Sequence, residues 1–133
     1  MFLFVCTGNT CRSPLAAALA RARGIEAESA GTAAWPGERA TAQAQRAAQR
    51  HGADLNAHRA RQVDAETLRR AERVLVMTPA HAAWLRDRFP ECAGRVQVLT
   101  PAIPDPFGGD DADYERCAVS LLLAMKNAGL LRD

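Results

Sequence analysis

The sequence predicts one α/β domain, in which an open, four-stranded parallel sheet is covered by helices on both faces. Four short predicted strands alternate with stretches of helical apolar spacing, and right-handed crossovers turn that order into a doubly wound, three-layer sheet. Two of the helical stretches open on a hydroxyl residue followed by proline, at Ser13-Pro14 and Thr78-Pro79. The 133 residues, 48% of them hydrophobic, suffice for one core, so we expect a single domain over residues 1–133.

The chain begins with a βαβ unit. Residues 2–5 form a continuous apolar run, which is typical of a central strand buried on both faces. Ser13 is the predicted N-cap of a helix of about ten residues that ends before Gly24. Residues 25–30 predict a weaker strand, and residues 31–38, which are rich in turn formers, predict a loop.

The rest of the chain alternates in the same way. Capping residues, apolar spacing, and the prolines and glycines that stop each element set the expected boundaries. In order, we predict a helix from Thr41 to just before Gly52, a short helix from Asp64 to Ala71, a strand over 74–77, a helix that ends by Phe89, a strand over 96–99, a loop over 100–110, and a last helix that carries Tyr114 and Met125.

Composition and charge argue against several kinds of partner. Lys and Arg number 17 and Asp and Glu 15, and the net charge of +2 is too small to favour nucleic acid. No run of about 18 apolar residues occurs, and residues 1–6 are too short for a signal-peptide core, so we expect no membrane association. The four cysteines lack the paired spacing of zinc sites and predict free thiols in a reducing cytoplasm.

Residues 6–13, which we call the anion loop, follow the first strand and open the first helix. Consecutive amides ahead of a helix N-terminus form a nest for an anion, and the helix dipole adds about half a positive charge there. Arg12 adds a planar fork that binds two oxygens of a phosphoryl group. We therefore expect inorganic phosphate or another oxyanion to bind at Thr7, Gly8, Asn9, Thr10, Cys11, Arg12 and Ser13.

Cys6 stands at the start of the anion loop, where the positive field lowers the pKa of a thiol. We expect it to be largely thiolate near neutral pH and to attack phosphorus as a nucleophile. Ser13 is expected to cap the helix, and a hydrogen bond from Ser13 to Cys6 is one of two open interpretations. Asn9 is expected to shape the loop through its side chain. Cys11 is either a buried filler or the partner of Cys6 in a reversible disulfide.

Asp105 is the candidate proton donor. It follows the last predicted strand in the sequence Pro-Asp-Pro-Phe and therefore lies at the same sheet edge as Cys6. A leaving group displaced from phosphorus needs a proton, which a carboxylic acid on a loop supplies; the alternative is that Asp105 only initiates a turn. Trp35 is either a pocket wall or an ordinary loop residue, and Phe107 is a further expected pocket residue.

The remaining histidines, cysteines and large aromatic residues show no pattern that demands chemistry, and the histidines have no metal-ligand spacing. We expect structural or solvated roles for His51, His58 and His81, inert thiols at Cys92 and Cys117, and core positions for Trp84 and Tyr114.

Three stretches together resemble the low-molecular-weight protein tyrosine phosphatase family, namely residues 5–14, 29–32 and 105–107. The resemblance runs over nearly the whole chain. It implies a flavodoxin-like fold, a phosphocysteine intermediate on Cys6, phosphate binding by Arg12 and the loop amides, and Asp105 as general acid and later as general base. It also implies phosphorylated proteins as substrates and no metal or organic cofactor.

Within the family, the substrate residue has two interpretations. Thr10 and the Phe-Gly-Gly after Asp-Pro resemble the bacterial protein arginine phosphatases, which slightly favours phosphoarginine. Trp35 and residues 58–63 resemble the tyrosine-specific members instead, and the link from the last strand to Asp105 is shorter than in arginine phosphatases. Phosphotyrosine is therefore the alternative substrate.

Two other functions compete with the phosphatase interpretation. Arsenate reductases resemble this fold and use a similar Cys-x5-Arg loop, but their chemistry needs two further cysteines close together, whereas Cys92 and Cys117 are 25 positions apart in the sequence. A non-catalytic phosphate-binding module is the third possibility. An intact cysteine, arginine and aspartate set argues against such a module.

Overall fold

A computed structural model describes residues 1–132 and contains one four-stranded sheet in which all the strands are parallel. The strand order is β2-β1-β3-β4, so the first strand is central, as the sequence predicts. The strands are β1 (Phe2–Cys6), β2 (Ala27–Gly31), β3 (Arg73–Val76) and β4 (Val96–Val98).

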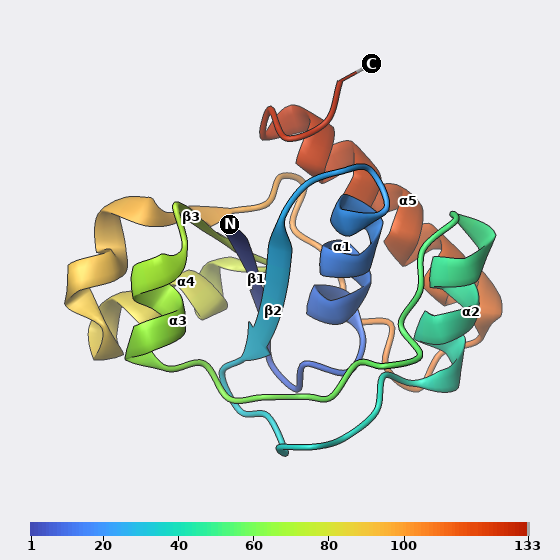
Figure 1. Cartoon of the computed structure of the whole chain (residues 1–133), viewed down its shortest axis with the longest axis horizontal. Coiled ribbons are helices and arrows are strands. Elements are labelled where there is room, and N and C mark those ends of the chain that lie inside the picture. The colour runs from blue at the N-terminus through green and yellow to red at the C-terminus, as the bar shows by residue number, and fades with distance from the viewer. Residues whose placement is uncertain (133) are drawn as a thin grey trace.

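Helices cover both faces of the sheet, which confirms the predicted α/β class and its three layers (Figure 1). The helices α1 (Arg12–Arg21), α2 (Ala42–Arg50) and α5 (Asp111–Asn127) lie on one face. The shorter α3 (Ala65–Arg70) and α4 (Pro79–Arg88) lie on the other. Because β1 and β2 run in the same direction, both strands deliver the chain into loops at one edge of the sheet, the bottom of Figure 1.

The central strand shows why a continuous apolar run predicts two-sided burial. Leu3 and Val5 pack into the core beneath α3 and α4, while Phe4 and Cys6 pack into the core beneath α1 and α5. The side chains of Leu3, Phe4 and Val5 are fully buried. Burial of each such side chain contributes about 1.5–3 kcal/mol, so β1 anchors both layers and holds Cys6 on the α1 side.

The start of β2 and the segment after α4 differ from the prediction. Ile25 does not begin β2, because its amide donates to the carbonyl of Ala20 at 3.1 Å and so completes the end of α1 around Gly24, whose φ is +81°. A 3₁₀ helix, η1 (Pro90–Arg95), was not predicted. Pro90 ends α4 as expected, but proline also suits the first turn of a new helix.

Gly31 ends β2 directly beside Cys6 in the register of the sheet. A Cβ atom at this position would lie 2.4 Å from the backbone oxygen of Thr7 and 3.2 Å from Cβ of Asn9. The anion loop therefore passes so close to β2 that only a residue without a side chain fits. At Gly94, in η1, an added Cβ would meet nothing within 4 Å.

We expect Gly31→Ala to lower the free energy of unfolding by about 1–3 kcal/mol, because the backbone of the anion loop must move to admit the methyl group. Urea denaturation of purified protein measures this change. Gly94→Ala is the matched control and should change the free energy of unfolding by less than about 0.5 kcal/mol. Equal effects of the two substitutions would contradict the close approach at Gly31.

Candidate active site

A cavity of about 260 Å³ lies at the carboxyl edge of the sheet, between the anion loop and two other loops. Its lining residues come from residues 6–12, from the loop before α2 and from the loop before α5. They are Cys6, Thr7, Gly8, Thr10, Cys11, Arg12, Glu38, Asp105 and Phe107. The fold thus brings together three segments that are far apart in the sequence.

Most of the predicted site residues lie at this cavity, and three do not line it. Asn9 and Ser13 belong to the anion loop, but both residues are fully buried and do not line the cavity. Trp35 is 77% exposed and is not among the residues that line the cavity, so the structure does not support its interpretation as a pocket wall. Glu38 lines the cavity but was not predicted, because a charged residue in a Gly-rich and Pro-rich loop has the pattern of an ordinary solvated turn.

Ser13 does not cap α1. The N-cap is Cys11, and its side chain makes no capping hydrogen bond. Ser13 lies one residue inside the helix, where its hydroxyl is 2.9 Å from Sγ of Cys6. The prediction of an N-cap was wrong because the anion loop itself forms the turn into the helix.

Burial raises the pKa of the Cys6 thiol above its ordinary value, because a thiolate at this position loses its water. The Ser13 hydroxyl, the amides of Ser13 and Asn9, and the charge of Arg12 all lower it. Burial is the largest of these effects, so the pKa shifts in the direction opposite to the one expected from the positive field of the loop. The packing that assembles the anion loop also removes water from its sulfur.

Asn9 holds the anion loop in shape from within. Its φ is 58°, a left-handed conformation that asparagine adopts more readily than most residues. Its side-chain Nδ2 donates to Oγ of Ser13 at 2.8 Å and to Oγ of Ser29 at 3.0 Å, while its Oδ1 accepts from the amide of Arg61 at 2.9 Å. The buried side chain therefore ties the loop to α1, to β2 and to the segment before α3.

Two histidines support the same loop from outside. Nε2 of His58 donates to the carbonyl oxygen of Asn9 at 2.7 Å. Nε2 of His81 lies 2.9 Å from Oγ1 of Thr7, and burial, together with the nearby charge of Arg12, lowers the pKa of His81 to about 4. His81 is therefore neutral at pH 7. Within residues 1–132, no cluster of His, Cys, Asp and Glu is arranged to hold a metal ion.

Arg12 reaches across the cavity and joins the anion loop to the loop that carries Asp105. Its side chain is 6% exposed, its Nη1 donates to the carbonyl of Ile103 at 2.9 Å, and its Nη2 lies 3.8 Å from Oδ2 of Asp105. The Asp105 side chain is 54% exposed, and its Oδ1 accepts from the amide of Phe107 at 3.0 Å. Asp105 thus initiates a turn, as its alternative interpretation predicts, and it also lines the cavity.

The other cysteines differ in their surroundings. The Cys11 thiol is 3.1 Å from the hydroxyl of Tyr114, which is buried as expected. Cys92 lies in the core beneath α4 and Cys117 in the core beneath α5, so the two are on opposite faces of the sheet. All four described cysteines are free thiols, and a Cys6–Cys11 disulfide stays a prediction.

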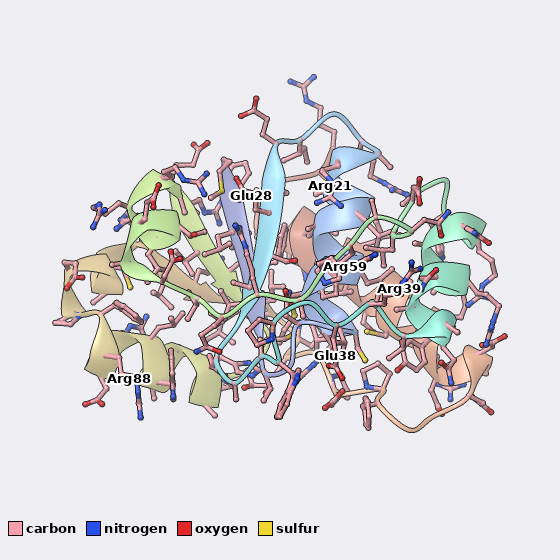
Figure 2. All side chains as sticks on the ribbon, turned by 60° about the horizontal axis from the view of Figure 1, so that its bottom comes forward. Arg21, Glu28, Glu38, Arg39, Arg59 and Arg88 are labelled. Atoms are coloured by element: carbon pink, nitrogen blue, oxygen red, sulfur yellow. The ribbon has the colours of Figure 1, made fainter. Side chains whose placement is uncertain are left out.

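Trp84 is only half-buried, which corrects its expected place in the core. It packs at the edge of the core beneath α4, and the guanidinium of Arg88 lies 4.5 Å from its ring centroid. Arg88 projects outward from α4 (Figure 2). One turn of helix separates the two residues, so the guanidinium covers a ring face that packing leaves open.

His51, the third histidine, contacts Glu115 at 2.8 Å, away from the residues of the cavity.

This arrangement suits chemistry at a tetrahedral oxyanion. The amides of the loop and the N-terminus of α1 favour negative charge, and a buried guanidinium stands beside them. A thiol lies at the base of the loop and an exposed carboxylate at its mouth. A second cavity of about 570 Å³, lined by residues 104–109 and by α5, shares Asp105 and Phe107 but contains neither Cys6 nor Arg12.

Residues 1–128 match the family model described as low molecular weight phosphotyrosine protein phosphatase. The chain belongs to this family. A protein-arginine-phosphatase from Geobacillus stearothermophilus is 41% identical over an alignment of 117 residues, and the match covers 80% of this chain and 78% of that protein. A low molecular weight protein-tyrosine-phosphatase from Streptomyces coelicolor is 36% identical over 135 residues, covering 86% and 82%. The chain is accordingly a hydrolase of the protein phosphatase class.

A solved phosphatase structure has the same fold. It is a cysteine-to-serine mutant of the YwlE arginine phosphatase, described as carrying a phosphorylated active-site serine. It superimposes with a TM-score of 0.89 at 31% identity, covering 96% of this chain and 91% of its own. The phosphatase fold implied by the sequence resemblance is therefore confirmed. No helix within residues 1–132 is long and apolar enough to cross a membrane.

We expect Ser13→Ala to shift the pH dependence of Cys6 alkylation toward higher pH. The hydroxyl lowers the pKa of the thiol, so its loss raises that pKa further and leaves less thiolate at any given pH. At pH 7, the rate of reaction with iodoacetamide should fall about tenfold, which corresponds to one hydrogen bond to a charged group. Mass spectrometry of the modified Cys6 peptide measures the rate.

Ser29→Ala is the matched control for this experiment. Both serine hydroxyls accept from Asn9, but only that of Ser13 contacts the sulfur. A smaller shift is expected for Ser29→Ala. Equal shifts in the two variants would mean that the shape of the loop sets the pKa, and that the Ser13 hydroxyl does not.

Proposed function

We propose that this chain hydrolyses phosphorylated protein side chains through a phosphocysteine intermediate on Cys6, and that phosphoarginine is preferred over phosphotyrosine. One observation carries the proposal: a thiol, a buried guanidinium and an exposed carboxylate line a single cavity at the N-terminus of α1. Phosphate groups of the substrate and of the product bind the amides of residues 7–13 and Arg12. No cofactor takes part in the proposed reaction.

In the first step, Sγ of Cys6 attacks phosphorus and the bond from phosphorus to the leaving atom breaks. The buried thiol gives its proton to a phosphoryl oxygen of the substrate, whose second pKa is near 6 in free phosphoesters. The Ser13 hydroxyl and the loop amides stabilise the sulfur as it becomes negative. Asp105, in its protonated form, gives its proton to the leaving nitrogen or oxygen.

In the second step, the Asp105 carboxylate takes a proton from water as that water attacks phosphorus and the sulfur–phosphorus bond breaks. Phosphate is released, and the Cys6 sulfur takes back the proton that the phosphoryl oxygen accepted in the first step. Arg12 spans two phosphoryl oxygens in both steps, where a lysine would offer one point charge. The related arginine phosphatase with a phosphorylated serine at its active site supports a covalent phosphoenzyme.

The preference for phosphoarginine rests on polar groups at the cavity. Thr10 and Asp105 both line it, and a hydroxyl and a carboxylate suit a guanidinium edge better than a phenyl ring. Trp35, which resembles the tyrosine-specific members, does not line it. Phe107 favours the second candidate, phosphotyrosine, because it adds an aromatic surface at the mouth of the cavity.

Cys92 and Cys117 lie on opposite faces of the sheet, which argues against a disulfide relay and hence against arsenate reduction.

We expect Asp105→Asn to slow formation of the phosphocysteine by about 10²–10⁴-fold when the leaving group is poor, and much less when it is good, because only a poor leaving group needs the proton. Single-turnover kinetics on a series of aryl phosphates measures this dependence. Asp87→Asn, an exposed position on α4, should change neither rate. A uniform loss across the series would show that Asp105 positions the loop and donates no proton.

Parallel kinetics on phosphoarginine and phosphotyrosine peptides of the same sequence test the substrate. We expect a higher kcat/KM for phosphoarginine, and Thr10→Ile should shift the ratio toward phosphotyrosine because it replaces a hydroxyl with apolar bulk. Polar recognition can discriminate by about 10⁴-fold, whereas apolar shape gives about 10–200-fold. A wild-type preference for phosphotyrosine would overturn the arginine assignment. Loss of all turnover in Cys6→Ser, with phosphate binding retained, is expected for either substrate.

A further inference from the structure

Glu38 is a residue of the cavity for which the proposed reaction has no use. Among the described residues that line this cavity, the charged side chains are Arg12, Asp105 and Glu38. A carboxylate beside an anion site opposes the binding of phosphate, so Glu38 weakens the attraction that the loop and Arg12 exert. Such a charge is useful only if the ligand carries a compensating cation next to its phosphoryl group.

The backbone at Glu38 is held in place relative to the anion loop. The amide of Gly37 donates to the carbonyl of Ala60 at 2.8 Å, and the amide of Ala60 donates to the carbonyl of Glu38 at 2.7 Å. Residues 58–61 are in turn bonded to Asn9 by the His58 ring and by the amide of Arg61. Four hydrogen bonds therefore connect the loop of Glu38 to the residue that shapes the anion loop.

The Glu38 carboxylate is exposed and is not engaged by a partner within residues 1–132. Other surface carboxylates differ: Glu28, for example, binds both Arg61 and Arg70. Glu38, labelled in Figure 2, lines the same cavity as Asp105 in the segment that leads to α5. Arg39 forms no ion pair with it in the described structure, so Arg39 does not neutralise the charge that Glu38 adds to the lining of the cavity.

We propose that Glu38 determines specificity by contacting a cation that directly follows the phosphoryl group, the guanidinium of phosphoarginine. This inference rests on the proposed function. Phosphoarginine places a delocalised positive charge one bond from phosphorus, whereas phosphotyrosine places a neutral ring there. Asp105 is protonated when it donates to the leaving nitrogen, so at that stage it carries no negative charge. Glu38 takes no part in the proton transfer, and its carboxylate binds the other edge of the guanidinium.

The test is the ratio of kcat/KM for a phosphoarginine peptide to that for a phosphotyrosine peptide, measured for Glu38→Gln. We expect the ratio to fall about threefold to fivefold, the size of one exposed ion pair. Glu38→Lys should lower it further, because a cation then faces the guanidinium. Glu91→Gln, an exposed glutamate on η1, is the matched control and should leave the ratio as in the wild type.

Ionic strength gives a second, independent readout. Raising it from about 0.01 M to about 1 M shortens the screening length from about 30 Å to about 3 Å, so the wild-type ratio should fall while the Glu38→Gln ratio changes less. An unchanged ratio in Glu38→Gln overturns the role of Glu38 even if the wild type prefers phosphoarginine. A wild type that prefers phosphotyrosine overturns the substrate proposal, while a lower ratio in Glu38→Gln would still support the contact with a cation. Absence of any turnover of phosphoarginine overturns both.

Discussion

The site depends on the left-handed turn at Asn9, the one non-glycine residue of the described chain with a positive φ. A strained backbone of this kind costs on the order of 1–3 kcal/mol. Three hydrogen bonds from the buried side chain offset that cost, at about 0.5–1.5 kcal/mol each, and a fourth bond reaches the carbonyl oxygen of the same residue. The Asn9 side chain is also linked to the sulfur of Cys6, because the Ser13 hydroxyl that accepts from Asn9 lies 2.9 Å from that sulfur.

The chemistry of Cys6 follows from this packing in two opposing ways. Close approach of the loop to β2, which only Gly31 permits, buries the thiol and raises its pKa. The same approach supplies the Ser13 hydroxyl and the loop amides that lower it. Burial is the larger effect, so the net shift of the pKa favours the thiol. A buried neutral sulfur also avoids repelling the dianion that must enter.

The mouth of the site is built by segments that meet only in the folded chain. Arg12 holds the loop of Asp105 through the carbonyl of Ile103, and residues 58–61 connect Asn9 to the loop of Glu38. The carboxylates of Glu38 and Asp105 therefore line one cavity although 67 positions separate them in the sequence. The charges around an anion site are thus set by loops whose positions depend on buried hydrogen bonds.

The sequence by itself determined the layers of the sheet and the central place of β1, because apolar periodicity and helix starts are local signals. It also placed Asp105 near the anion loop, because ligand sites in open parallel α/β sheets lie beyond the carboxyl ends of the strands. Tertiary structure decided what depends on contacts between distant segments. Ser13 bonds the sulfur instead of capping α1, burial reverses the expected direction of the Cys6 pKa, Trp35 stays at the surface, and Glu38 reaches the cavity. The desolvation of the Cys6 thiol and the positions of the loops arise from packing between distant segments, so no local pattern of residue types predicts them.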